Sequence, residues 1–247
     1  MMIKHFFSFS VLFALMISTL VNAQDSIVTS DFEAWAGITV QKSFLDKKLD
    51  LSLTQEFRFD DNSSHLDNYF TQLGGRYEII DGLKIGGAYR FIRNNRNSGY
   101  RNEHRFNADV SYKHQVNQFT LNYRFRYTNH NLIGVTRSEG DYATHKYRLR
   151  IKVKYNIKNW KLDPYLSIEG FLAQETNEFN YVESITETNK VVGFEKLRYT
   201  LGTSYKFAKF FEIGAFYRIE QGFKSYPNNY NLSTIYYIGG LNLNFNF

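Results

Sequence analysis

The chain has 247 residues, with 30 Lys and Arg against 24 Asp and Glu, a net charge of +6 and no cysteine. The lack of cysteine excludes disulfide frameworks, thiolate metal sites, cysteine nucleophiles and a lipoprotein anchor. Hydrophobic residues make up 43% of the chain, yet after the first residues no apolar run approaches the roughly twenty residues of a membrane-spanning helix, which excludes a helical membrane protein. The basic residues form no isolated run, so the sequence does not indicate nucleic-acid binding.

Residues 1–23 have the composition of a secretory signal peptide. Lys4 supplies a positive charge, residues 6–20 are mainly apolar, and Val21-Asn22-Ala23 offers small residues to a signal peptidase. We therefore predict cleavage near Ala23 and one mature domain over residues 24–247. The alternative, an N-terminal membrane anchor, would need a longer apolar stretch.

Eleven segments alternate apolar and polar residues with a period of two, which predicts strands with one apolar face. They are 32–41, 49–60, 67–79, 83–93, 101–114, 119–129, 142–155, 162–174, 194–207, 210–220 and 232–247. Connections near 80–82, 115–118, 156–161 and 208–209 are tight, whereas those at 60–66, 94–100, 129–141, 175–193 and 221–231 are longer. Short periplasmic turns alternating with longer external loops are typical of outer-membrane barrels.

Four tyrosines lie on the apolar faces just before tight turns. They are Tyr77, Tyr112, Tyr155 and Tyr205. A Tyr ring is apolar with a polar tip, so these positions predict an aromatic girdle at a membrane boundary. The alternative, a soluble β-sandwich, would bury these rings in its core.

These patterns predict an all-β fold, a transmembrane antiparallel β-barrel of ten to twelve strands connected as an up-and-down meander. Bacterial barrels have an even number of strands, so eleven segments leave three arrangements open. Residues 24–31 thread the lumen, a further weak strand exists, or one segment is a plug. The last segment ends with Phe245 and Phe247 on its apolar face, and we expect Phe247 to be a signal for the barrel-assembly machinery.

The polar strand faces carry many charges, which we expect to point into the lumen. The predicted luminal charged wall consists of Lys146, Arg148, Arg150, Lys152, Lys154, Arg124, Arg126, Glu56, Glu169 and Glu212. Buried charges need partners, so ion pairs that fill the lumen are one interpretation. Because the basic residues concentrate on segment 142–155, a water-filled lumen that favours anions is another.

Three runs resemble the family catalogued as domain of unknown function 2490. They are Asp31-Phe32-Glu33-Ala34-Trp35-Ala36-Gly37-Ile38, then Leu51-Ser52-Leu53-Thr54-Gln55-Glu56-Phe57-Arg58-Phe59-Asp60-Asp61-Asn62, and Gly86-Gly87-Ala88-Tyr89-Arg90-Phe91-Ile92-Arg93. The resemblance implies a signal peptide and an outer-membrane barrel of a Gram-negative, Bacteroidota-type bacterium. It carries over no catalytic residues.

No motif points to an enzyme. Outer-membrane lipid hydrolases typically carry His-x-Ser, and none of the histidines after residue 23 is followed two residues later by Ser. An omptin-like protease has only Asp60-Asp61 and Asp141 with His145 in its favour. We therefore predict no catalytic, cofactor-binding or metal-binding residues, and expect the lipid bilayer and lipopolysaccharide as partners.

The main hypothesis is a structural barrel with a charged lumen. A lipid-modifying hydrolase and a narrow anion-preferring channel are the alternatives.

Overall fold

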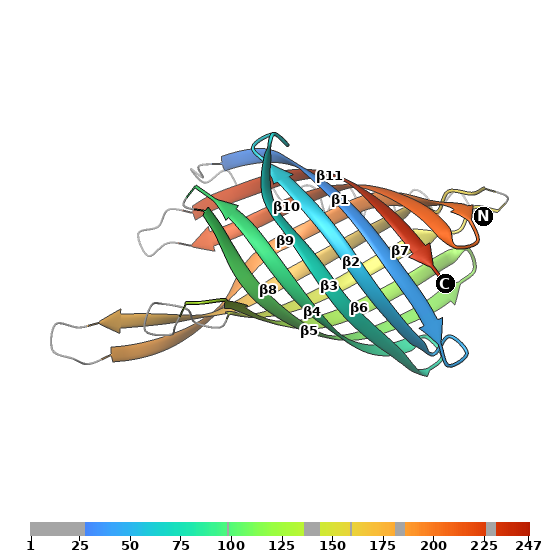
Figure 1. Cartoon of the computed structure of the whole chain (residues 1–247), viewed down its shortest axis with the longest axis horizontal. Helices are drawn as coiled ribbons and strands as arrows, with labels where there is room; N and C mark the ends of the chain where they lie inside the picture. The colour runs from blue at the N-terminus through green and yellow to red at the C-terminus, as the bar shows by residue number, and fades with distance from the viewer. Residues whose placement is uncertain (1–27, 98, 136–143, 159, 181–185, 226–230) are drawn as a thin grey trace, which may run out of the picture.

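The computed structural model describes residues 28–97, 99–135, 144–158, 160–180, 186–225 and 231–247. The expected signal peptide and residues 24–27 lie outside this part of the chain. Among the described residues, no helix is long and apolar enough to cross a membrane. The backbone instead forms strands throughout, in one closed barrel (Figure 1).

The structure confirms the all-β prediction and contains eleven strands within the described residues. They are β1 (Val28–Phe44), β2 (Leu49–Asp60), β3 (His65–Ile80), β4 (Leu83–Arg96), β5 (Gly99–Val116), β6 (Phe119–Leu132), β7 (Thr144–Tyr155), β8 (Tyr165–Asn180), β9 (Thr186–Ala208), β10 (Phe211–Ser225) and β11 (Asn231–Asn246). Most strands are longer than the alternating segments, because backbone pairing continues where the side-chain pattern fades.

The barrel closes through a parallel pair. Every strand pairs antiparallel with its neighbour in the chain, but Val28–Gln41 of β1 pairs parallel with Ser233–Asn246 of β11. An up-and-down meander with an odd number of strands leaves its first and last strands pointing the same way, so it closes only in parallel. All eleven strands belong to the wall, hence none is a plug, and residues 28–31 lie in β1 instead of threading the lumen.

The connections sort to the two ends of the barrel. Tight turns join β1 to β2, β3 to β4, β5 to β6 and β9 to β10 at the end where the C-terminus lies (Figure 1). Two connections expected to be long loops, 94–100 and 175–193, are mostly strand. β8 and β9 stay paired as far as Asn180 and Thr186 and project beyond the rest of the wall (Figure 1).

One tight turn depends on glycine. Gly82 follows Asp81 between β3 and β4 and has φ +78°. A Cβ added there would lie 2.2 Å from the carbonyl oxygen of Lys113. Both its backbone conformation and its surroundings therefore favour glycine.

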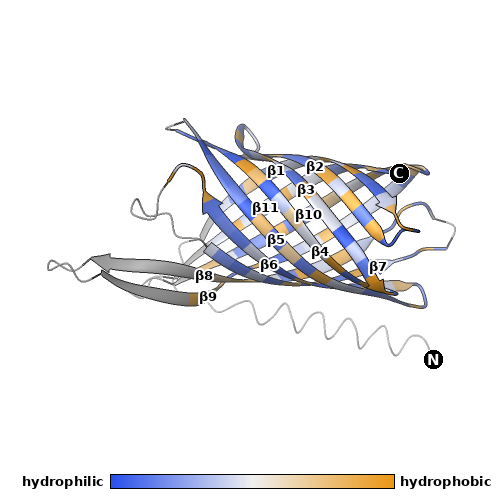
Figure 2. Ribbon diagram, turned by 60° about the horizontal axis from the view of Figure 1, so that its bottom comes forward, coloured by the Kyte–Doolittle hydropathy of each residue, from blue (hydrophilic) through white to orange (hydrophobic). Residues whose placement is uncertain are grey.

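The barrel places apolar side chains outside and polar side chains inside, the reverse of a soluble protein. Large apolar side chains such as Leu53, Leu73, Leu149 and Leu201 are more than half exposed on the outer face. The buried residues in the described chain include nine polar or charged ones and six hydrophobic ones. Figure 2 shows hydrophobic and hydrophilic residues alternating along the strands of the wall. Apolar side chains thus cover the outside, and polar ones occupy the interior.

Gly240 gives room to two inward aromatic rings next to the closing seam. In the ladder it pairs with Trp35 of β1 and with Phe216 of β10. The Phe216 ring lies over it, so that a Cβ at Gly240 would be 2.1 Å from Phe216 Cζ. Trp35 packs edge-on against Phe216 with ring centroids 6.4 Å apart, and this contact limits the movement of Phe216.

We predict that Gly240→Ala destabilises the barrel by about 1–3 kcal/mol, the usual cost of overpacking. The Gly87→Ala variant is the matched control, because its nearest contact would be an ordinary 3.7 Å. Urea unfolding followed by far-UV circular dichroism measures both variants. Equal midpoints for the two would contradict the packing role of Gly240.

Candidate functional site

The barrel encloses a cavity of about 360 Å³ lined mainly by basic side chains. Its walls come from β1, β2 and β4 to β10. The basic lining residues are Arg58, Arg90, Arg105, Arg124, Arg126, Lys146, Arg148, Arg150, Lys152, Lys196, Arg198 and Arg218. Only two carboxylates, Glu56 and Glu169, line the same cavity. Basic side chains therefore outnumber carboxylates in the lining of this cavity.

Glu169 of β8 holds three arginines together. Its carboxylate lies 2.8 Å from Arg124, 3.0 Å from Arg148 and 3.1 Å from Arg198. Its side chain is only 4% exposed. These contacts come from four neighbouring strands, β6 to β9, because the four residues occupy adjacent inward positions in the ladder.

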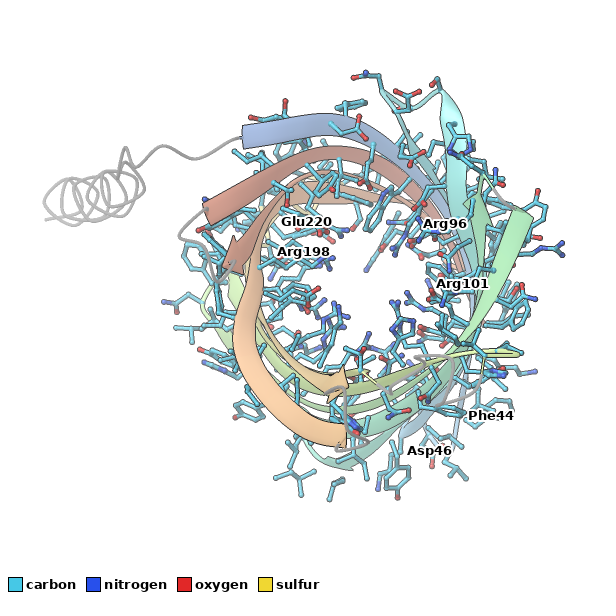
Figure 3. The ribbon with its side chains drawn as sticks, turned by 90° about the vertical axis from the view of Figure 1, so that its left-hand side faces the viewer. Phe44, Asp46, Arg96, Arg101, Arg198 and Glu220 are labelled. Atoms are coloured by element: carbon cyan, nitrogen blue, oxygen red, sulfur yellow. The ribbon has the colours of Figure 1, made fainter. Side chains whose placement is uncertain are left out.

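A second carboxylate extends this arrangement to β10. Glu220 lies 2.5 Å from Arg198 and 2.7 Å from Lys196. Figure 3, which views the barrel from the end opposite the tight turns, shows Arg198 and Glu220 on the inner side of the wall. We call Glu169, Glu220, Arg124, Arg148, Lys196 and Arg198 the charge network. Its members compensate one another's charge where water is scarce.

Inward aromatic rings support the cations. Trp35 has the Arg58 guanidinium 3.7 Å and the Arg218 guanidinium 4.6 Å from its ring centroid. Phe70 supports Arg90 at 3.6 Å. Phe171 has three members of the charge network within 5.1 Å. Stacking on aromatic rings holds the flexible basic side chains in place without neutralising them.

Four lining cations have no carboxylate within ion-pair distance in the described part of the chain. Arg90 donates two hydrogen bonds to Gln72, and Arg150 donates one of 3.2 Å to Asn122. Lys152 lies over the Tyr165 ring at 3.5 Å, and Arg218 donates to Thr200 Oγ1 at 3.2 Å. Among the described residues, six carboxylates form ion pairs with the other eight lining cations.

The structure brings most of the predicted luminal wall into this one cavity. Lys146, Arg148, Arg150, Lys152, Arg124, Arg126, Glu56 and Glu169 all line it. Lys154 instead pairs with Asp163 at 2.5 Å, beside the turn between β7 and β8. Glu212 also lies towards the tight-turn end, opposite Lys206 in the ladder.

The four tyrosines predicted to form a girdle lie on the outer face, near the ends of β3, β5, β7 and β9 at the tight-turn end of the barrel. Tyr77, Tyr112 and Tyr155 are exposed, and Tyr205 is half-buried. Phe247 lies at the same end. Its ring stacks on Phe210 with centroids 6.1 Å apart, and its backbone nitrogen donates to Gln41 of β1 at 2.9 Å.

Sequence reasoning missed two features of the cavity. The inward aromatics Trp35, Phe70 and Phe171 interrupt otherwise polar faces, and that interruption was the available signal. Lys196 was missed although it lies two residues before Arg198 on the same face of β9, so the alternation itself was the available signal.

The histidines make no catalytic grouping in the described residues. His130 bonds to Glu103 at 2.6 Å, His65 to Asp60 at 2.8 Å, and His145 to Tyr127 at 2.7 Å. None of these pairs includes a serine. No three His, Asp or Glu side chains of the described residues are placed to hold a metal ion. Chemically, the cavity offers cationic hydrogen-bond donors to an anion.

We predict that Glu169→Gln lowers the free energy of unfolding by about 3–5 kcal/mol, because it leaves three arginines without their shared counter-charge. Glu212→Gln is the control, since this carboxylate forms no ion pair with the described residues. Thermal melting of both variants tests the prediction. A Glu169→Gln variant as stable as wild type would show that water, and not Glu169, compensates the arginines.

The comparisons with known proteins give a family and no function. No curated protein matches this chain. A family model described as "Protein of unknown function (DUF2490)" matches residues 32–231, which include every residue that lines the cavity. The chain therefore belongs to the DUF2490 family of proteins of unknown function.

Proposed function

We propose that this protein is an outer-membrane β-barrel whose positively charged lumen takes up and passes small anions. The observation that carries the proposal is the cavity, which twelve basic side chains and two carboxylates line.

The reversed distribution of polar and apolar residues supports the location. Residues on the outer face such as Leu51, Ile85, Phe125 and Ile151 would cost free energy in water, because each exposes an apolar side chain. Hydrocarbon removes that cost, and the closed ladder leaves no strand edge unpaired within it. A cleaved signal peptide and lipopolysaccharide around the barrel are parts of the same proposal.

The surplus of cations supports the preference for anions. Arg90, Arg150, Lys152 and Arg218 face the interior, and each remains half-buried and not fully enclosed. Since they have no carboxylate partner in the described chain, their charge acts on whatever occupies the cavity. A lumen walled by one sign of charge concentrates ions of the opposite sign.

One observation favours a second function. The charge network crosses five neighbouring strands, β6 to β10, and such a network stiffens a wall without passing anything. A structural barrel with a filled lumen is therefore the alternative, and conductance separates it from the channel.

We predict that the wild-type protein fractionates with the outer membrane. On gels without boiling it should migrate as a compact band that shifts after boiling, because a closed barrel resists detergent until it is heated. Separation of the two membranes on a density gradient, followed by paired gel lanes, is the measurement. Recovery in the soluble fraction, with no shift on boiling, would contradict the location.

We predict single-channel currents with chloride preferred over potassium in a planar bilayer. The double variant Arg90→Gln and Arg150→Gln removes two unpaired charges and should lower the permeability ratio by about twofold. Arg76→Gln is the control, since Arg76 bonds to Gln41 outside the cavity. A wild-type protein without measurable current would favour the structural barrel. An unchanged permeability ratio in the double variant would show that Arg90 and Arg150 do not cause the anion preference.

A further inference from the structure

Two neighbouring rows of inward residues differ in their charge. One row runs across Arg150, Glu169, Arg198 and Glu220 and alternates in sign. The adjacent row, which we call the hydroxyl row, runs across Lys152, Ser167, Thr200 and Arg218. It has a cation at each end, two hydroxyls between them and no carboxylate.

The two cations of the hydroxyl row form no ion pair with the described residues. Lys152 contacts the face of Tyr165, and Arg218 is stacked between Trp35 and Phe216, each centroid 4.6 Å away. Arg150 lies two residues before Lys152 on β7, and its described partner is the neutral Asn122. Three cations on one section of wall therefore have no carboxylate within ion-pair distance among the described residues.

Tyr165 closes this section on the side of the tight turns. Its ring crosses Gly202, where an added Cβ would lie 2.5 Å from the Tyr165 hydroxyl oxygen. The phenol is thus directed from β8 over β9, towards the strand that carries Arg218. Glycine at position 202 makes this position of the ring sterically accessible.

Several donors in this section have no partner in the described residues. Arg150 Nε and Arg218 Nη1 are buried without a hydrogen-bond partner, and the hydroxyls of Tyr165 and Ser167 form no hydrogen bond to another described residue. A buried donor without a partner costs free energy, so it favours an acceptor that arrives from outside the chain. All four residues line the cavity.

We propose that Arg150, Lys152, Tyr165, Ser167 and Arg218 form a binding site for a phosphate-type oxyanion. A guanidinium group presents paired N–H donors that suit the oxygens of such an anion, and an ammonium group and two hydroxyls supply further donors. Its double negative charge offsets most of the local positive charge. This inference rests on the proposed entry of anions into the lumen, and it names the class of anion that the lumen retains.

Binding is measured on the folded, detergent-solubilised barrel by titration calorimetry with inorganic phosphate. Glucose 6-phosphate, a sugar phosphate, forms a second arm, and sodium chloride is the monovalent comparison. We expect saturable binding of phosphate and no saturable binding of chloride. Tighter binding of glucose 6-phosphate would identify a phosphate ester as the preferred source, and weaker binding would identify the free ion.

Trp35 provides a second readout, because its ring contacts Arg218. The chain has two tryptophans, and Trp160→Phe removes the other one, which is exposed on the outside. In that background, phosphate should change the Trp35 emission over the concentration range in which calorimetry shows binding. An emission that stays constant while calorimetry shows binding would place the anion elsewhere and overturn the site.

Two variants test the site with little effect on the fold. Lys152→Gln should weaken phosphate binding about tenfold, as expected for a lost hydrogen bond to a charged group. Tyr165→Phe keeps the ring and removes only the hydroxyl, and should weaken binding about threefold to tenfold. Arg76→Gln is the control and should bind like wild type.

The results separate this inference from the proposed function. Anion-selective currents without saturable phosphate binding would contradict the binding site and support the proposed channel function. Saturable phosphate binding that both variants weaken, in a barrel without current, would support the binding site and contradict the channel function. Binding that neither variant weakens would overturn the site.

Discussion

Closure of β1 onto β11 is the constraint on which the rest of the molecule depends. Eleven strands in an up-and-down meander end parallel to their beginning, and only a parallel ladder pairs both edges. Once that ladder forms, every strand has one face inside and one outside. Without it, the edges would stay unpaired and the two faces would have no enclosed space between them.

Charged side chains in the enclosed space need compensation, and those that stay unpaired create a field in the cavity. Glu169 and Glu220 compensate the arginines and lysines nearest to them. The remaining cations are supported by rings and amides, such as Trp35 beneath Arg218 and Gln72 beside Arg90. These neutral supports hold a cation in position without cancelling its field, which therefore extends into the cavity.

Glycine and aromatic residues shape the same region. Gly240 and Gly202 lie beneath the rings of Phe216 and Tyr165, so both rings lie close against the wall. Phe216 then packs against Trp35 across the seam, and Tyr165 bounds the cavity towards the tight turns. The packing that closes the barrel and the donors that line it are thus parts of one arrangement.

Local periodicity predicted the eleven strands and their inward and outward faces, but it underestimated most strand lengths and assigned 94–100 and 175–193 to loops that are mostly strand. It also predicted that Lys146, Arg148, Arg150 and Lys152 share a face. Tertiary structure alone decided how an odd number of strands closes, because closure joins residues more than two hundred positions apart. It likewise decided that Glu169 pairs with Arg148 while Lys152 contacts only an aromatic ring, since ion pairing depends on the register between strands. Periodicity identifies the face of a residue, whereas its partner depends on which strands become neighbours.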